Sequence, residues 1–168
     1  NLMYSKQKGK QFEEKIAQII QKYCQKHFPN LETNLANLQV RRSPFSGIAQ
    51  YELGDIELGI YRLVLPKLVI ECKKWKQLNF NNSLFSVLKT LEKLYISYKE
   101  QYNKKLTETK IDLVLVFSAN YGKIYCFTEL DFDNIDNIRY KQFMVYEFEE
   151  FINMYIQKTK ENNTLICG

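Results

Sequence analysis

The sequence predicts an α/β fold in which helices cover a mixed β-sheet. Two observations predict this class. First, stretches with the three- and four-residue apolar spacing of amphipathic helices alternate with short apolar runs typical of strands. Second, the 168 residues are 45% hydrophobic and 26% charged, which excludes a disordered chain, a coiled-coil rod or a collagen-like fibre. No linker or internal repeat divides the chain, so we expect one domain over residues 1–168.

Three stretches have the apolar spacing of amphipathic helices. The first covers residues 8–28, and Pro29 ends it because proline lacks the amide hydrogen of a helix interior. The second covers residues 83–102 and the third residues 146–157. These helices are expected to cover the sheet.

Four stretches have the pattern of strands, namely residues 54–58, 63–73, 111–117 and 123–128. The run at 111–117 is almost continuously apolar, which favours a buried central strand. The first two are expected to be strands joined by a short connection. Residues 31–40 are ambiguous and are expected to form a loop that leads into a short strand.

Positive charge is concentrated in the first two-thirds of the chain. Residues 1–110 carry 19 Lys and Arg against 10 Asp and Glu, whereas residues 111–168 carry 5 against 9. Within the basic part, the turn-rich segment 41–47 is expected to be an exposed loop. A basic surface suits a polyanion such as nucleic acid, because neutralised phosphates release counterions. Lysines that only provide solubility are the alternative, and charge alone does not decide between the two.

Several function classes are disfavoured by what the sequence lacks. The four cysteines form no CxxC pair and His27 is the only histidine, so a Cys/His zinc site is not expected. The absence of a glycine-rich phosphate loop weakens the case for a small-molecule α/β enzyme. No apolar run is long enough to cross a bilayer, and no leader opens the chain. We therefore expect no membrane partner and a cytoplasmic or nucleoid-associated protein that is not secreted.

One group of charged residues belongs to two adjacent predicted strands. Asp55 follows Gly54, and Glu71 and Lys73 would share one face of a strand while Cys72 points the other way. If the two strands are antiparallel neighbours, Asp55 lies beside Glu71. Converging carboxylates at the end of an apolar strand need partners, and a divalent cation such as Mg²⁺ would be one. The alternative is an ordinary salt-bridged cluster.

This group resembles the metal-binding signature of the PD-(D/E)xK nuclease superfamily. The resemblance lies in Gly54-Asp55 and in residues 68–73, Leu-Val-Ile-Glu-Cys-Lys, with Gly54 in place of the proline of the family name. Residues 8–13 and 41–47 are similar to the helix motif and the phosphate-binding loop of its Holliday-junction-resolvase-like, phage and homing endonuclease branch. The resemblance implies a restriction-endonuclease-like fold, with a mixed β-sheet core flanked by helices.

The resemblance also implies residue roles. Glu13, Asp55 and Glu71 would hold Mg²⁺, for which Mn²⁺ could substitute, with the carbonyl of Cys72 as an extra ligand. Lys73 would serve the nucleophile, so that Glu13, Asp55, Glu71 and Lys73 form the catalytic set. The DNA backbone would be contacted by Arg41, Arg42 and Ser46. Lys74 and Lys76 flank the predicted site and are also expected to contact phosphates, with a solvated basic surface as the alternative for these two lysines.

The expected function is therefore a metal-dependent DNA endonuclease that acts on Holliday junctions or on related branched or site-specific DNA. Because one active site must be duplicated to cut two strands, we expect a homodimer or higher homo-oligomer. A site-specific homing endonuclease and a non-catalytic DNA-binding module of the same fold are the alternatives. For the acidic residue of the first helix, Glu14 is a second candidate, although the motif register favours Glu13.

Overall fold

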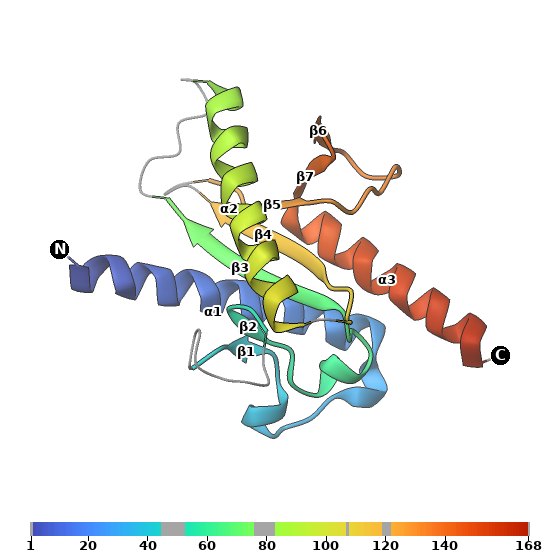
Figure 1. Ribbon diagram of the computed structural model, residues 1–168. Helices are drawn as coiled ribbons and strands as arrows, with labels where there is room; N and C mark the ends of the chain where they lie inside the picture. Colours follow the sequence, from blue (N-terminus) through green and yellow to red (C-terminus); the bar gives the residue numbers. More distant parts are fainter. Residues whose placement is uncertain (1, 45–52, 76–82, 107, 119–121, 168) are drawn as a thin grey trace. The chain divides into compact units, whose positions relative to one another are not determined.

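The computed structural model describes residues 2–44, 53–75, 83–106, 108–118 and 122–167, with side chains from residue 9 to residue 163 (Figure 1). By its internal contacts the chain forms two compact units. One consists of residues 1–66 and 149–168, and the other of residues 67–148. The expectation of one domain stays a prediction. No helix in the described ranges is long and apolar enough to cross a membrane.

The first unit contains helices and a small sheet. Its helices are α1 (Leu2–His27) and most of α3 (Phe148–Cys167), and its 3-10 turns are η1 (Pro29–Leu31), η2 (Ala36–Leu38) and η3 (Gly59–Leu63). The strands β1 (Arg41–Arg42) and β2 (Ile56–Glu57) pair antiparallel, and α1 contacts both. The buried stripe of α1 recurs every four residues, at Phe12, Ile16, Ile20 and Cys24. This four-residue recurrence is the spacing that predicted the helix.

Polar contacts join α1 to α3 within the first unit. The Tyr23 hydroxyl donates to Oε1 of Glu149 at 3.1 Å, and one turn further along α1, Nε2 of His27 lies 2.7 Å from Oδ1 of Asn153. His27, the single histidine, therefore contacts α3 from the end of its helix.

The second unit is built on a mixed sheet. Its strands are β3 (Leu68–Lys74), β4 (Asp112–Ser118), β5 (Tyr125–Thr128), β6 (Ile138–Tyr140) and β7 (Phe143–Glu147), arranged in the order β3-β4-β5-β7-β6. β3 and β4 are parallel and are connected through α2 (Leu84–Lys105), while the other neighbouring pairs are antiparallel. These elements confirm the predicted α/β class and are consistent with a restriction-endonuclease-like fold.

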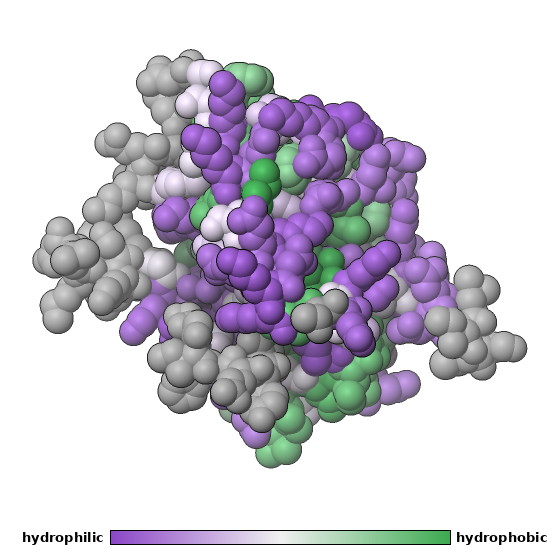
Figure 2. Space-filling model, viewed as in Figure 1, coloured by the Kyte–Doolittle hydropathy of each residue, from purple (hydrophilic) through white to green (hydrophobic). Residues whose placement is uncertain are grey.

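Helix α2 packs on one face of this sheet. Its buried residues are Leu88, Leu91, Tyr95 and Tyr102. The Tyr95 ring makes edge contacts with Phe127 at 5.9 Å and Phe143 at 5.1 Å between ring centroids. Over α2 the outer surface is largely hydrophilic (Figure 2), which matches the one-sided apolar pattern in the sequence.

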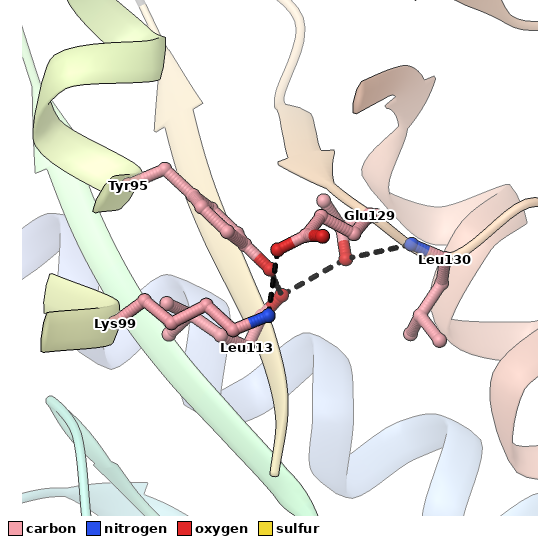
Figure 3. Close-up of polar contacts among 6 residues, drawn as sticks. Tyr95, Lys99, Leu113, Glu129 and Leu130 are labelled. Carbon is pink, nitrogen blue, oxygen red and sulfur yellow. Dashed lines mark hydrogen bonds and ion pairs between the residues drawn. The ribbon is translucent and has the colours of Figure 1, made fainter. Parts of the chain in front are cut away.

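Polar contacts also fix α2 to the sheet (Figure 3). The Tyr95 hydroxyl donates to the carbonyl of Leu113 at 3.3 Å, and the same carbonyl accepts a bond from Oγ1 of Thr128 at 2.9 Å. One turn along the helix, Nζ of Lys99 lies 2.6 Å from Oε1 of Glu129. Burial and the Glu129 charge raise the pKa of Tyr95, so its hydroxyl stays protonated and able to donate.

The strands that carry Asp55 and Glu71 do not meet the condition under which Asp55 would lie beside Glu71, because they are not antiparallel neighbours. β2 pairs with β1, and β3 pairs with β4, so these two strands are not hydrogen-bonded neighbours. Residues 59–63 form η3, which Gly59 starts at φ +58°, and the second strand begins at Leu68 and not at Leu63 as predicted. The long apolar strand β4 offers β3 a partner over all seven of its residues, from Leu68 to Lys74.

Other boundaries also differ from the predictions. Arg41 and Arg42 form β1, and Ser43 is only 3% exposed, so the start of segment 41–47 is not an exposed loop. The strands β6 and β7 were not predicted, and Tyr146 belongs to β7 and not to the following helix. The three predicted helices and the strands at 111–117 and 123–128 are confirmed.

Candidate active site

Two of the predicted metal ligands, Glu13 and Asp55, lie in the first unit. Glu13 follows the buried Phe12 on α1, and its side chain is 19% exposed. Burial raises the pKa of Glu13 and the negative charge of Asp55 raises it further, while Arg42 and Lys10 lower it. An electrostatic effect of one carboxylate on the other requires the two to be close in space. The fold of this unit therefore brings Glu13 and Asp55 together.

The backbone fixes Asp55 at the start of β2. The preceding Gly54 has φ +85°, in the left-handed region where glycine carries no Cβ penalty. The Asp55 carbonyl accepts a bond from the amide of Ser43 at 2.8 Å, which extends the pairing of β1 and β2 by one residue beyond Arg42 and Ile56. The glycine that replaces the family proline thus has a local structural role.

Arg41 and Arg42, which were predicted to contact phosphate, each form an ion pair with a glutamate. Nε of Arg41 donates to Oε2 of Glu57 at 2.8 Å, and Nε of Arg42 donates to Oε2 of Glu13 at 3.3 Å. The Arg42 contact places a positive charge beside Glu13 and Asp55 and offsets part of their repulsion. It also distinguishes Glu13 from the neighbouring Glu14, which is exposed.

The end of β3, in the second unit, carries the other predicted site residues that the structure describes. Side chains alternate along this strand, so Glu71 and Lys73 share one face and Cys72 and Lys74 share the other, as predicted. Glu71 is 7% exposed and Lys73 is exposed, while Cys72 and Lys74 are half-buried. The strand therefore passes from the apolar core to a polar end at Glu71.

Tyr102 contacts one of the predicted site residues, Glu71, although nothing in the sequence pointed to this contact. Its hydroxyl donates a hydrogen bond to Oε1 of Glu71. The burial of Tyr102 could have been predicted from the sequence, because it continues the apolar face of α2. The buried positions on this face, Leu88, Leu91, Tyr95 and Tyr102, follow one another in steps of three, four and seven residues. What the sequence does not give is the strand residue that the last of these side chains meets.

The predicted residues are divided between the two units. Glu13, Arg41, Arg42 and Asp55 belong to the first, and residues 71–74 to the second. Ser46 and Lys76 lie outside the described residues. In the part of the chain that the structure describes, no group of three or more His, Cys, Asp or Glu side chains could hold a metal ion.

The chemistry of the donors nevertheless fits a hard divalent cation. Glu13 and Asp55 offer carboxylate oxygens within the first unit. Mg²⁺ in proteins is bound by one or two carboxylates together with water and substrate phosphate, and it does not need an all-protein cage. A pair of carboxylates such as Glu13 and Asp55 would meet that requirement.

Comparison with known proteins identifies the class. The family model described as "Phage putative PDDEXK endonuclease" matches residues 4–167. The chain therefore belongs to this family, which confirms the resemblance to PD-(D/E)xK nucleases and their phage branch. Nucleases of this superfamily act on DNA and generally use divalent metals. Neither the curated proteins nor the solved structures that were searched contain a match.

Proposed function

We propose that this chain is a Mg²⁺-dependent DNA endonuclease, with Mn²⁺ as a substitute, and that Glu13, Asp55, Glu71 and Lys73 form its active site. The observation that carries the proposal is the closeness of Glu13 and Asp55. These carboxylates come from different elements, both belong to the family signature, and their mutual repulsion is a cost that a cation would offset.

In the proposed site, the cation would be held by Glu13, Asp55 and Glu71 together with the carbonyl of Cys72. When bound, the cation supplies charge neutralisation at the scissile phosphate and lowers the pKa of water. Lys73, on the same face of β3 as Glu71, orients the attacking water and helps to remove its proton. The water oxygen bonds to phosphorus as the bond from phosphorus to the leaving oxygen breaks.

Basic residues position the DNA. Arg42 borders the carboxylate pair, so a phosphate that it contacts would lie next to the cation. Arg41, Ser46, Lys74 and Lys76 complete the proposed backbone contacts, which carry affinity without sequence information.

We further propose that the substrate is branched DNA such as a four-way junction, or a specific duplex site. Cleavage of both strands calls for two copies of the site, so the active species is a homodimer or a higher homo-oligomer. A strictly monomeric species by light scattering in the presence of DNA would contradict this part of the proposal.

The test is cleavage of supercoiled, linear, single-stranded and four-way-junction DNA, each with Mg²⁺ or with EDTA. We expect cleavage with Mg²⁺ only, and its loss in Asp55→Ala, Glu71→Ala and Lys73→Ala variants whose circular dichroism is unchanged. Glu13→Ala and Glu14→Ala form a matched pair on α1, of which only the first should lose activity. Wild-type cleavage by Asp55→Ala would reject the proposal, and salt-sensitive binding without cleavage would indicate a non-catalytic module.

A further inference from the structure

Tyr102 is held firmly at the end of α2. Its side chain is 7% exposed, and its carbonyl accepts the bond from the amide of Leu106 at 2.8 Å that closes the last turn of the helix. Its hydroxyl meets the carboxylate of Glu71 on β3. A buried tyrosine fixed at both backbone and hydroxyl has little freedom to reorient.

The buried carboxylate of Glu71 needs a hydrogen-bond donor such as the Tyr102 hydroxyl. At 7% exposure it has lost most of its contact with water, and the residues before it, Leu68 to Ile70, are at most 1% exposed. A buried anion without donors is costly. The terminal torsion of a glutamate is broad, so a fixed donor on one oxygen also narrows the directions in which the other lone pairs point.

A tyrosine satisfies the carboxylate without cancelling its charge. A lysine or arginine at this place would neutralise the negative charge that attracts a cation. A neutral hydroxyl orients the carboxylate and leaves its charge in place. This distinction favours a role in ligand orientation over simple core packing.

We infer that Tyr102 is a positioning residue for metal binding: its hydroxyl holds the Glu71 carboxylate in the orientation that ligates the cation. The inference rests on the proposed function, in which Glu71 is a metal ligand. Removal of a group that orients a metal ligand typically weakens metal affinity by about 10–100-fold.

The chain offers a matched control on the same helix. Tyr95 is also buried, at 2% exposure, and its hydroxyl also donates one hydrogen bond into the sheet. Its acceptor is the backbone carbonyl of Leu113, and the carboxylate beside it is that of Glu129, which is not a proposed metal ligand. Tyr95→Phe and Tyr102→Phe therefore each remove one buried hydroxyl from α2, but only the second affects Glu71.

The test measures Mn²⁺ binding to the full chain without DNA, from the electron paramagnetic resonance signal of free Mn²⁺. Relative to wild type, Tyr102→Phe should weaken binding by about tenfold or more, and Tyr95→Phe by less than about twofold. The concentration of Mn²⁺ that half-saturates cleavage should shift in parallel, with KM for DNA unchanged. Both variants should unfold at similar denaturant concentrations, because each has lost one hydrogen bond.

A Glu71→Gln variant distinguishes failure of the positioning role of Tyr102 from failure of the metal assignment of Glu71. If Glu71→Gln weakens Mn²⁺ binding while Tyr102→Phe binds as wild type or more tightly, the positioning role is overturned and the proposed function stands. Equal weakening in both tyrosine variants also overturns it, since that result reflects general loosening of α2. If Glu71→Gln binds Mn²⁺ like wild type, the metal assignment of the proposed function fails and the inference fails with it.

Discussion

Arg41 and Glu57 face each other across the small sheet of the first unit. They are paired residues in the register of β1 and β2, with Nε of Arg41 2.8 Å from Oε2 of Glu57. The glutamate side chain is 11% exposed, whereas that of Arg41 is 45% exposed. One end of the arginine thus balances a buried carboxylate while the side chain remains accessible to a phosphate.

This pairing predicts that Arg41→Ala lowers stability as well as DNA binding. Loss of the guanidinium leaves the Glu57 carboxylate buried without its cation, at a cost of about 1–3 kcal/mol after allowance for the exposure of Arg41. The measurement is the urea midpoint of unfolding. Adding Glu57→Gln to Arg41→Ala should recover part of the loss, because the unpaired charge is removed. Lys22→Ala, which breaks an exposed pair with Glu149, serves as the control and should change the free energy of unfolding by less than about 0.5 kcal/mol.

Substitution by alanine should change the free energy of unfolding in opposite directions at Gly59 and at Gly9. At Gly59, φ is +58° and a Cβ would overlap the Leu38 carbonyl and lie 2.7 Å from the carbonyl oxygen of Gln39, both backbone groups that cannot move aside. Gly59→Ala should therefore lower the free energy of unfolding by about 2 kcal/mol or more. At Gly9, inside α1, a Cβ meets nothing within 4 Å.

Gly9→Ala should raise the free energy of unfolding by about 0.5–1 kcal/mol, because glycine is a poor helix former. Denaturant titration of the two variants beside wild type checks both signs. Equal effects of the two substitutions would show that the backbone at position 59 does not require glycine.

Periodicity made the helices and the central strand predictable, but it carries no information on partners. Residues 84–105 repeat their apolar positions over many turns, and residues 113–117 are apolar without interruption, so local sequence defines both. The pairing of β2 with β1 depends on residues more than ten positions away. The sequence of residues 54–58 does not predict which strand pairs with them. The same limit explains why the sequence pointed to Glu71 but not to Tyr102.

The boundary between β7 and α3 could not be predicted for a different reason. β7 ends at Glu147 and α3 begins at Phe148, with no glycine, proline or other turn residue between them. Aromatic and apolar side chains run through the boundary, so a pattern search extends the helix back into the strand. The prediction of Glu13, Asp55, Glu71 and Lys73 as site residues, by contrast, rests on motif order, which does not depend on such boundaries.

Lys74→Ala should reduce the salt dependence of DNA binding. Each phosphate contact that is lost lowers the slope of log affinity against log salt concentration by about 1, because one fewer counterion is released. The measurement is fluorescence anisotropy of labelled duplex DNA between about 50 and 200 mM salt, in EDTA so that no cleavage occurs. Lys22→Ala is the control, since Lys22 pairs with Glu149 on the α1–α3 surface. An unchanged slope in Lys74→Ala would remove Lys74 from the proposed DNA contacts.

The buried thiol of Cys24 predicts how stability changes at alkaline pH. Cys24 is 0% exposed, and burial raises its pKa from 9.0 to about 12. The folded chain therefore keeps this proton to a higher pH than the unfolded chain. The resulting stabilisation is complete below pH 9 and is lost as pH rises from 9 towards 12, with a slope of up to about 1.4 kcal/mol per pH unit.

Cys24→Ala removes this term, so its free energy of unfolding should fall less steeply than that of wild type above pH 9, whatever the difference at neutral pH. Lysine deprotonation affects both proteins alike and cancels in the comparison. Because only the thiolate reacts with disulfide reagents, Cys24 and the buried Cys126 should also stay unlabelled by 5,5′-dithiobis(2-nitrobenzoate) in the native protein at about pH 8. A Cys72→Ser, Cys167→Ser background isolates these two thiols. Rapid labelling in that background would show that one of these two thiols is open to solvent, and parallel pH slopes for wild type and Cys24→Ala would show that Cys24 is not the buried group described.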